Sequence, residues 1–211
     1  MTIIKKAKLI PWTNPYASAN LIAMWDGIWN SGRDIHLPDT EQCIDLINGR
    51  ILSGNVKGDN TFIISTNSTF NDIDLSHDMT IEWLLDDASE FINDLFIAYS
   101  GGICYQVSGV RAGYANYQIR YWNGNEHVSV YPLTKSVCAA AIRYANGIFT
   151  VFRDGKELIS YDNATAVDDF QHVTIGRLSA IRCLRFYSRA LSNHEILLHY
   201  TLDHDRFKTP T

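Results

Sequence analysis

The strongest constraint on the fold is a pair of tight turns in the second half of the chain. Asn146-Gly147 and Asp154-Gly155 each stand between runs rich in β-branched and aromatic residues. Asn-Gly and Asp-Gly supply the positive φ angles of two-residue primed turns, which join neighbouring antiparallel strands. We therefore predict a three-strand antiparallel meander formed by Ala139–Tyr144, Ile148–Arg153 and Lys156–Tyr161.

Strand patterns separated by turn residues recur along the chain, with no internal repeat, low-complexity run or interdomain linker. In Met79–Leu85, Ile81, Trp83 and Leu85 alternate with the other residues, so we expect these three to face the core. The remaining expected strands are Leu21–Trp29, Thr61–Ser65, Tyr117–Trp122, His127–Tyr131 and Ile181–Tyr187. Many short strands and a single convincing helix indicate one all-β sandwich.

The one expected helix lies near the end of the chain. Ser192 and Glu195 have the S-x-x-E spacing of a capping box, in which each side chain accepts a hydrogen bond from the other's backbone N–H. Leu191 and Ile196 stand at the two positions of a hydrophobic staple around the same cap. We therefore predict that a short C-terminal helix begins at Ser192.

The same part of the chain resembles a known family. The order Ile175-Gly176, Leu184, Phe186-Tyr187, Arg189-Ala190-Leu191-Ser192 and Glu195-Ile196 is similar to the closing strand and helix of concanavalin A-like, laminin-G-like jelly-roll domains. The phrase GIFTVFRDGKEL, residues 147–158, is also similar to a strand pair of that family. The resemblance implies a two-sheet antiparallel β-sandwich with one short C-terminal helix. It implies no single function, because the family includes lectins, adhesion modules, glucanases and virion parts.

We expect one laminin-G-like domain over residues 19–211, preceded by a lead-in segment at residues 1–18. A chain of 211 residues corresponds to about one large domain. The lead-in is too apolar for a free tail, while Pro11 and Pro15 prevent a regular helix. We expect the lead-in to form an edge strand, either on this sandwich or on a partner.

Charge and hydropathy exclude two classes of partner. The net charge of −5 argues against a nucleic-acid-binding protein, which needs a basic surface to meet phosphates. No apolar run approaches the roughly 18–20 residues of a membrane span. The N-terminus also lacks the uninterrupted apolar segment of a signal peptide. We therefore expect a virion-associated or cytoplasmic protein without membrane insertion.

The cysteines and the acidic residues suggest no bound metal. Cys43, Cys104, Cys138 and Cys183 are widely spaced without a C-x-x-C pair, so we expect free, mostly buried thiols. Acidic residues gather in the middle of the chain at Asp72, Asp74, Asp86, Asp87, Glu90 and Asp94. Calcium takes roughly six to eight oxygen ligands, and these residues do not form its usual loop motif. We assign no cofactor and interpret the acids as a solvated face, with calcium as the alternative.

The spacing of the acidic residues around Glu82 argues against an enzymatic function. Retaining glucanases of the resembled family carry alternating acids, E-x-D-x-x-E or close to it, on one strand. Their chemistry needs two carboxyl groups about 5–5.5 Å apart. The nearest run is Glu82 to Asp87, and Leu84 stands where the central acid should be. We predict that the protein is not an enzyme and assign no catalytic residue; a glycoside hydrolase is the least favoured alternative.

The segment from Ser108 to Glu126 combines aromatic rings with planar polar side chains, which suit glycan recognition. On a strand, Gln118, Arg120 and Trp122 share one face, opposite Tyr117, Ile119 and Tyr121. The candidate glycan-binding residues are Tyr114, Gln118, Arg120, Trp122 and Asn123, with the first and last at the rim. The alternative interpretation is a half-buried strand with an ordinary polar outer face.

These observations favour a non-catalytic, lectin-like recognition module that binds a carbohydrate or a protein surface. The alternative is a structural component, such as a decoration or fibre protein of a phage particle or another assembly. The apolar lead-in favours that alternative, which predicts an oligomer or a larger complex. The two functions are compatible, since a virion component can also bind a host glycan.

Overall fold

The computed structural model describes residues 15–16, 19–28, 42–56, 62–85, 94–100, 103–108, 117–122, 127–133, 138–162, 172–176 and 180–207. Between residues 94 and 138 it describes the strands by their backbone. The rest of the predicted lead-in, the acidic residues Asp86, Asp87 and Glu90, and the candidate site residues Tyr114 and Asn123 lie outside the described residues.

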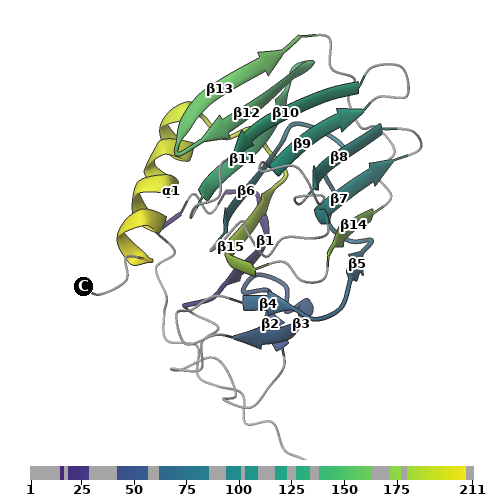
Figure 1. Ribbon diagram of the computed structural model, residues 1–211, viewed down its shortest axis with the longest axis vertical. Helices are drawn as coiled ribbons and strands as arrows, with labels where there is room; N and C mark the ends of the chain where they lie inside the picture. Colours follow the sequence, from purple (N-terminus) through teal and green to yellow (C-terminus); the bar gives the residue numbers. More distant parts are fainter. Residues whose placement is uncertain are drawn as a thin grey trace, which may run out of the picture.

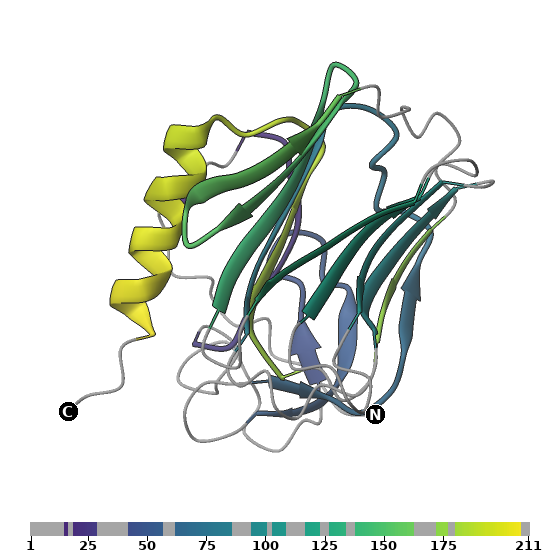
Figure 2. The same cartoon turned by 45° about the horizontal axis from the view of Figure 1, so that its top comes forward.

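Two antiparallel sheets face each other, as predicted (Figures 1 and 2). The larger, nine-stranded sheet has the order β13-β12-β11-β6-β15-β4-β3-β2, and β1 also pairs with β15. Its strands are β1 (Leu21–Asp26), β2 (Gln42–Ile44), β3 (Ile51–Val56), β4 (Phe62–Ile64), β6 (Met79–Leu85), β11 (Cys138–Ala145), β12 (Ile148–Arg153), β13 (Lys156–Tyr161) and β15 (Ala180–Tyr187).

The smaller, six-stranded sheet has the order β10-β9-β8-β7-β14-β5. Its strands are β5 (Ser68–Phe70), β7 (Asp94–Ser100), β8 (Ile103–Ser108), β9 (Tyr117–Trp122), β10 (His127–Leu133) and β14 (His172–Ile175). The helix α1 (Asn193–Arg206) lies against the outer face of the larger sheet, on the side away from the smaller sheet (Figure 2). At 14 residues α1 is too short to cross a membrane, and none of the described residues form a helix long and apolar enough to do so.

The predicted meander is confirmed. Asn146 and Gly147 have φ angles of 49° and 80°, and Asp154 and Gly155 have 50° and 74°, so both turns have the left-handed backbone of a primed hairpin. Strand β12 consequently pairs with β11 on one side and with β13 on the other.

The predicted strand Leu21–Trp29 is too long, because β1 ends at Asp26. The Asp26 carboxylate accepts a hydrogen bond from the backbone N–H of Ile28 at 3.0 Å. Gly27 donates its N–H to the Arg182 carbonyl at 2.8 Å. These two bonds turn the backbone out of the strand. The sequence pattern missed the boundary because the next residues are apolar as well.

The core lies between the two sheets, and the expected inward residues of β6 are confirmed. Ile81, Trp83 and Leu85 are fully or almost fully buried in the main cluster, with Trp25 and Phe186 beside them. The opposite face of β6 is buried too, because the C-terminal segment and α1 cover it. Strand β6 therefore has no solvent face, although its sequence alternates.

Helix α1 begins as predicted. The Ser192 hydroxyl accepts a hydrogen bond from the Glu195 N–H at 3.2 Å, and the Glu195 carboxylate accepts one from the Ser192 N–H at 2.8 Å. Leu191 and Ile196 are buried in one apolar cluster with Phe152, which completes the predicted staple. This cluster fixes the start of the helix against the larger sheet.

Two of the four cysteines have described side chains. Cys43 and Cys183 are buried free thiols, as expected. Burial raises the pKa of both thiols well above its ordinary value. Each therefore stays protonated and packs as a small apolar side chain.

Candidate functional site

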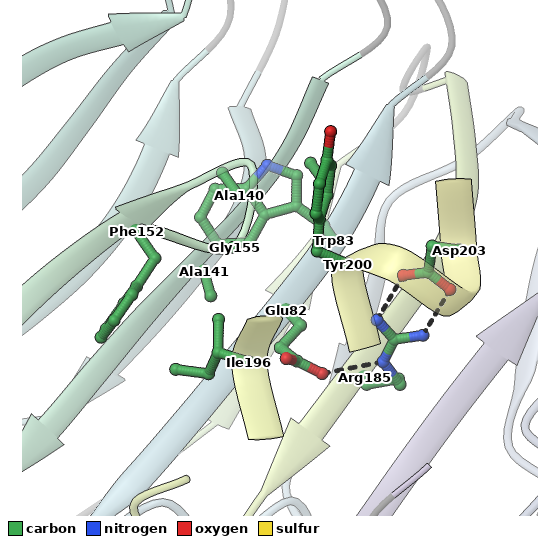
Figure 3. A pocket seen from close by; sticks show the side chains of 11 residues that line it. Glu82, Trp83, Ala140, Ala141, Phe152, Gly155, Arg185, Ile196, Tyr200 and Asp203 are labelled. Atoms are coloured by element: carbon green, nitrogen blue, oxygen red, sulfur yellow. Dashed lines mark hydrogen bonds and ion pairs between the residues drawn. The ribbon is translucent and has the colours of Figure 1, made fainter. Parts of the chain in front are cut away.

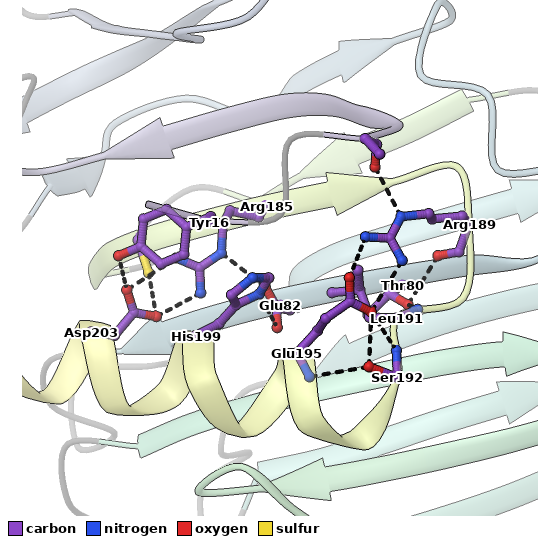
Figure 4. Close-up of polar contacts among 12 residues, drawn as sticks. Tyr16, Thr80, Glu82, Arg185, Arg189, Leu191, Ser192, Glu195, His199 and Asp203 are labelled. Atoms are coloured by element: carbon purple, nitrogen blue, oxygen red, sulfur yellow. Dashed lines mark hydrogen bonds and ion pairs between the residues drawn. The ribbon is translucent and has the colours of Figure 1, made fainter. Parts of the chain in front are cut away.

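A buried group of charged residues lies between α1 and the larger sheet (Figures 3 and 4). Arg185 on β15 stands opposite Glu82 on β6, and its Nε donates a hydrogen bond to Glu82 Oε2 at 2.9 Å. The two terminal nitrogens of Arg185 donate to the Asp203 carboxylate on α1 at 3.0 and 2.6 Å. One guanidinium therefore joins two strands to the helix.

Further polar side chains surround this group. His199 Nδ1 lies 2.9 Å from Glu82 Oε2. The Tyr16 hydroxyl donates to Asp203 Oδ1 (Figure 4). Arg206 contacts the same hydroxyl and pairs with Asp26 at 2.9 Å. Tyr16 thus connects the beginning of the described chain to the second half of α1.

The pKa shifts show why these groups remain charged. Burial lowers the pKa of Arg185, but the charges of Asp203 and Glu82 outweigh burial and raise it well above its usual value. Burial raises the pKa of Asp203, but Arg185 reverses this effect and the net pKa is lowered. A buried charge is tolerable only when it is paired and hydrogen-bonded in this way.

The geometry of Glu82 does not suit a hydrolytic acid. Its side chain is 4% exposed, pairs with Arg185 and lies beneath α1. A general acid must carry a proton and reach the substrate. The adjoining pocket, lined in part by Arg185, Tyr200 and Asp203, has a volume of about 20 Å³. This is room for about one water molecule, not for a sugar.

The described acidic residues form no metal site. No group of three or more His, Cys, Asp or Glu side chains suitable for a metal ion occurs within the described ranges. Asp72 pairs with Arg50 at 2.9 Å, and Asp74 accepts the Ser76 N–H at 2.9 Å. The alternative of a calcium site therefore gains no support from these two carboxylates.

The burial of alternate residues in β14 shows which face of the smaller sheet is the core face and which is the outer face. Val173 and Ile175 are fully buried in the core, whereas His172 and Thr174 are partly exposed. The Thr174 hydroxyl lies 3.0 Å from the hydroxyl of Thr69 on the neighbouring β5, in an exposed position. Thr174 and His172 therefore belong to the outer face of this sheet.

The outer positions of the other strands follow from the strand register, because directly opposed residues of antiparallel strands share a face. Ile97 on β7 stands opposite Thr174, Gln106 on β8 opposite Ile97, and Arg120 on β9 opposite Gln106. Arg120 thus takes an outer position.

The same alternation places the other described site residues. Gln118 and Trp122, two positions to either side of Arg120, also take the outer face, and Ile119 and Tyr121 take the core face. None of the described helices or strands lies over this outer face (Figure 2). Three of the five predicted site residues therefore share the outer face of the smaller sheet, over which no described helix or strand lies.

Sequence reasoning missed the joint role of Arg185, Asp203 and His199. A signal was present, because His199 and Asp203 lie four residues apart and so share a face of the predicted helix. Glu82 also alternates with the core residues of its strand, which indicates the opposite face. What was missing was the knowledge that the helix covers that face.

Comparisons with known proteins identify the fold. No protein-family model matches this chain, and no curated protein does. Among solved structures, the binding domain of botulinum neurotoxin serotype D superposes with a TM-score of 0.64 at 14% identity, over 90% of this chain and 53% of that one. The chain shares the β-sandwich fold of this domain.

Two further structures agree with this assignment. The botulinum neurotoxin DC binding domain in complex with SialylT has a TM-score of 0.62 at 9% identity, over 87% of this chain and 51% of that one. Trypanosoma rangeli sialidase in complex with the inhibitor DANA has a TM-score of 0.62 at 13% identity, over 96% of this chain and 37% of that one. This β-sandwich thus spans about half or less of each neighbour, and the likeness concerns the fold alone.

Proposed function

We propose that this lectin-like β-sandwich is a non-catalytic module that binds a glycan through the outer face of its smaller sheet. The observation that carries the proposal is the register, by which Gln118, Arg120 and Trp122 share an outer face that no described element covers. An aromatic ring stacks on the apolar face of a sugar, while amide and guanidinium groups bind its hydroxyls. One strand supplies all three groups.

The structural neighbours support a glycan as the ligand class. One toxin binding domain is in complex with SialylT, and the cell entry of botulinum neurotoxin type C depends on interaction with two ganglioside molecules. Another neighbour is a sialidase in complex with sialic acid. The motif order around Ser192 favours placing the domain among the concanavalin A-like, laminin-G-like sandwiches, a group that includes lectins.

The non-catalytic part of the proposal rests on the larger sheet. The acid that sequence analysis considered for hydrolysis, Glu82, is paired with Arg185 beneath the helix. The pocket beside it is too small for a sugar. Binding without bond cleavage is therefore the simpler function for this domain.

The test is a glycan-array screen of the purified protein, with calcium and with chelator. We expect saturable binding that chelator leaves unchanged, and we expect Trp122→Ala to abolish it while the circular dichroism spectrum stays that of the parent. Leu158→Ala is the matched control, because Leu158 is a large apolar residue, 48% exposed on the larger sheet.

Two outcomes would overturn this proposal. Unchanged binding by Trp122→Ala would remove the outer face of β9 from the site. A folded protein that binds no glycan would favour the structural alternative, for which sedimentation velocity should then detect an oligomer.

A further inference from the structure

Arg120 differs from most of the described arginines in the charge of its neighbours. Arg185 stands opposite Glu82 and binds it, Arg50 pairs with Asp45 at 2.7 Å, and Arg206 pairs with Asp26. An opposite charge on the neighbouring strand is a common way for a sheet to stabilise a charged residue. Pairing with a carboxylate is thus the commoner arrangement among these arginines, although Arg143 serves the fold by donating to the Leu191 carbonyl and the Asn193 side chain.

The strand positions next to Arg120 carry no carboxylate. The directly opposed residues are Gln106 on β8 and Ser129 on β10. The next outer positions of its own strand are Gln118 and Trp122. The diagonal outer positions are Cys104, Ser108 and His127.

Asp94, opposite Ser108 near the end of β7, is the nearest acid on this face in the paired strands. Its strand, β7, is two strands away from β9, and Asp94 is displaced along the strand direction by two residues relative to Arg120. Strands in a sheet lie about 4.8 Å apart, so this separation is on the order of 12 Å between Cα atoms. Asp94 is therefore neither a directly opposed nor a diagonal neighbour of Arg120.

The cation at Arg120 contrasts with the negative charge of the whole chain. The protein has a net charge of −5, yet Arg120 places a cation on the outer face of the smaller sheet, next to neutral residues and His127 in the paired strands. A guanidinium is permanently charged and binds a carboxylate through two parallel hydrogen bonds, which a neutral sugar does not offer. The chemistry of the face therefore suits an anionic ligand.

We propose that the glycan bound by this face is acidic and carries a carboxylate, as sialic and uronic acids do. Arg120 binds the carboxylate, and Trp122 supplies the stacking surface two residues along the strand, about 7 Å away. This separation is comparable with the size of one monosaccharide. The inference rests on the glycan-binding function proposed above and adds the class of sugar.

The test is calorimetric titration of the protein with 3′-sialyllactose and with lactose, which differ by one carboxylated sugar. A glucuronate-terminated glycan and its neutral glucose counterpart form a second pair. We expect the acidic member of at least one pair to bind at least about tenfold more tightly, the usual worth of a charge-assisted hydrogen-bonded pair. We also expect this preference to weaken as salt is added.

Arg120→Gln should remove the preference while leaving the weaker binding of the neutral sugar. Arg120→Lys should retain part of it, because a lysine keeps the charge without the bidentate geometry. Arg153→Gln is the matched control: it removes one positive charge from the larger sheet, where Arg153 pairs with Asp154 at 3.4 Å.

The outcomes separate this inference from the function on which it rests. Equal affinity for acidic and neutral sugars, or a preference that survives Arg120→Gln, overturns the acidic-glycan inference and leaves glycan binding standing. Absence of binding to any of the four sugars and to the array overturns both.

Discussion

At the scale of single residues, Arg185 is a buried charge that connects two strands to the helix. Its guanidinium donates to carboxylates on β6 and on α1, and it also lies 4.1 Å from the ring centre of Tyr16. The ionic interactions outweigh the cost of burial only while every partner is present. Removing one partner leaves a buried charge without compensation.

Asp203→Asn should therefore destabilise the fold strongly. We expect the free energy of unfolding to fall by about 3–5 kcal/mol, the usual cost of breaking a buried ion pair. Urea denaturation followed by tryptophan fluorescence measures it. The control is Asp205→Asn on the same helix, where the carboxylate is 62% exposed and a change below about 0.5 kcal/mol is expected. Equal effects at the two positions would show that the buried network does not stabilise the helix.

At the scale of elements, the position of α1 depends on the turn between β12 and β13. A Cβ atom at Gly155 would lie 2.9 Å from Leu197 Cδ1 and 3.0 Å from Leu197 Cα. The turn thus approaches the helix closely because its glycine has no side chain. The same glycine also supplies the φ of 74° that the primed turn requires.

Gly155→Ala should destabilise the fold through both backbone strain and a clash with the helix. The same substitution at Gly49 measures the backbone strain alone. Gly49 has nearly the same φ, 73°, but a Cβ there would meet nothing within 4 Å. Gly49→Ala should cost about 1–2 kcal/mol for the left-handed backbone alone. Gly155→Ala should cost about 1–3 kcal/mol more, because the helix must move. Thermal and urea unfolding of both variants measure the difference; equal losses would show that the helix yields without cost.

At the scale of the whole molecule, the two outer faces of the sandwich have different roles. The helix seals the outer face of the larger sheet at β6 and β15, and the charged network lies beneath it. The outer face of the smaller sheet bears no described element. A variant that weakens the helix should therefore alter stability, whereas one on β9 should alter binding.

The stability of the whole molecule should fall in acid, in part through Glu195. Hydrogen bonds from Arg189 and Ser192 lower the pKa of Glu195 from 4.5 to about 2. Because the folded pKa lies below the unfolded one, the stabilisation is complete above about pH 4.5 and disappears as the pH falls towards 2. Glu195→Gln should therefore flatten the decline of unfolding free energy over that range, measured by urea denaturation at a series of pH values. An unchanged slope would show that the capping carboxylate does not contribute to acid sensitivity.

Local patterns were sufficient for the parts of this fold that local chemistry determines. The turns at Asn146-Gly147 and Asp154-Gly155, and the cap at Ser192, require particular backbone angles or hydrogen bonds within a few residues. Such interactions act between sequence neighbours, so the antiparallel meander and the start of the helix were predictable. The end of β1 was not, because it depends on a hydrogen bond to the distant Arg182.

The sequence alone therefore determined the class of fold, the hairpins, the capped helix and the division of β9 into two alternating sets of residues. Only the tertiary structure decided which set lies outside, because that depends on register with β14, more than fifty residues further along the chain. The tertiary structure also brought together Glu82, Arg185 and Asp203. Alternation along a strand specifies two faces, but what covers each face is decided by segments that meet it only after the chain has folded.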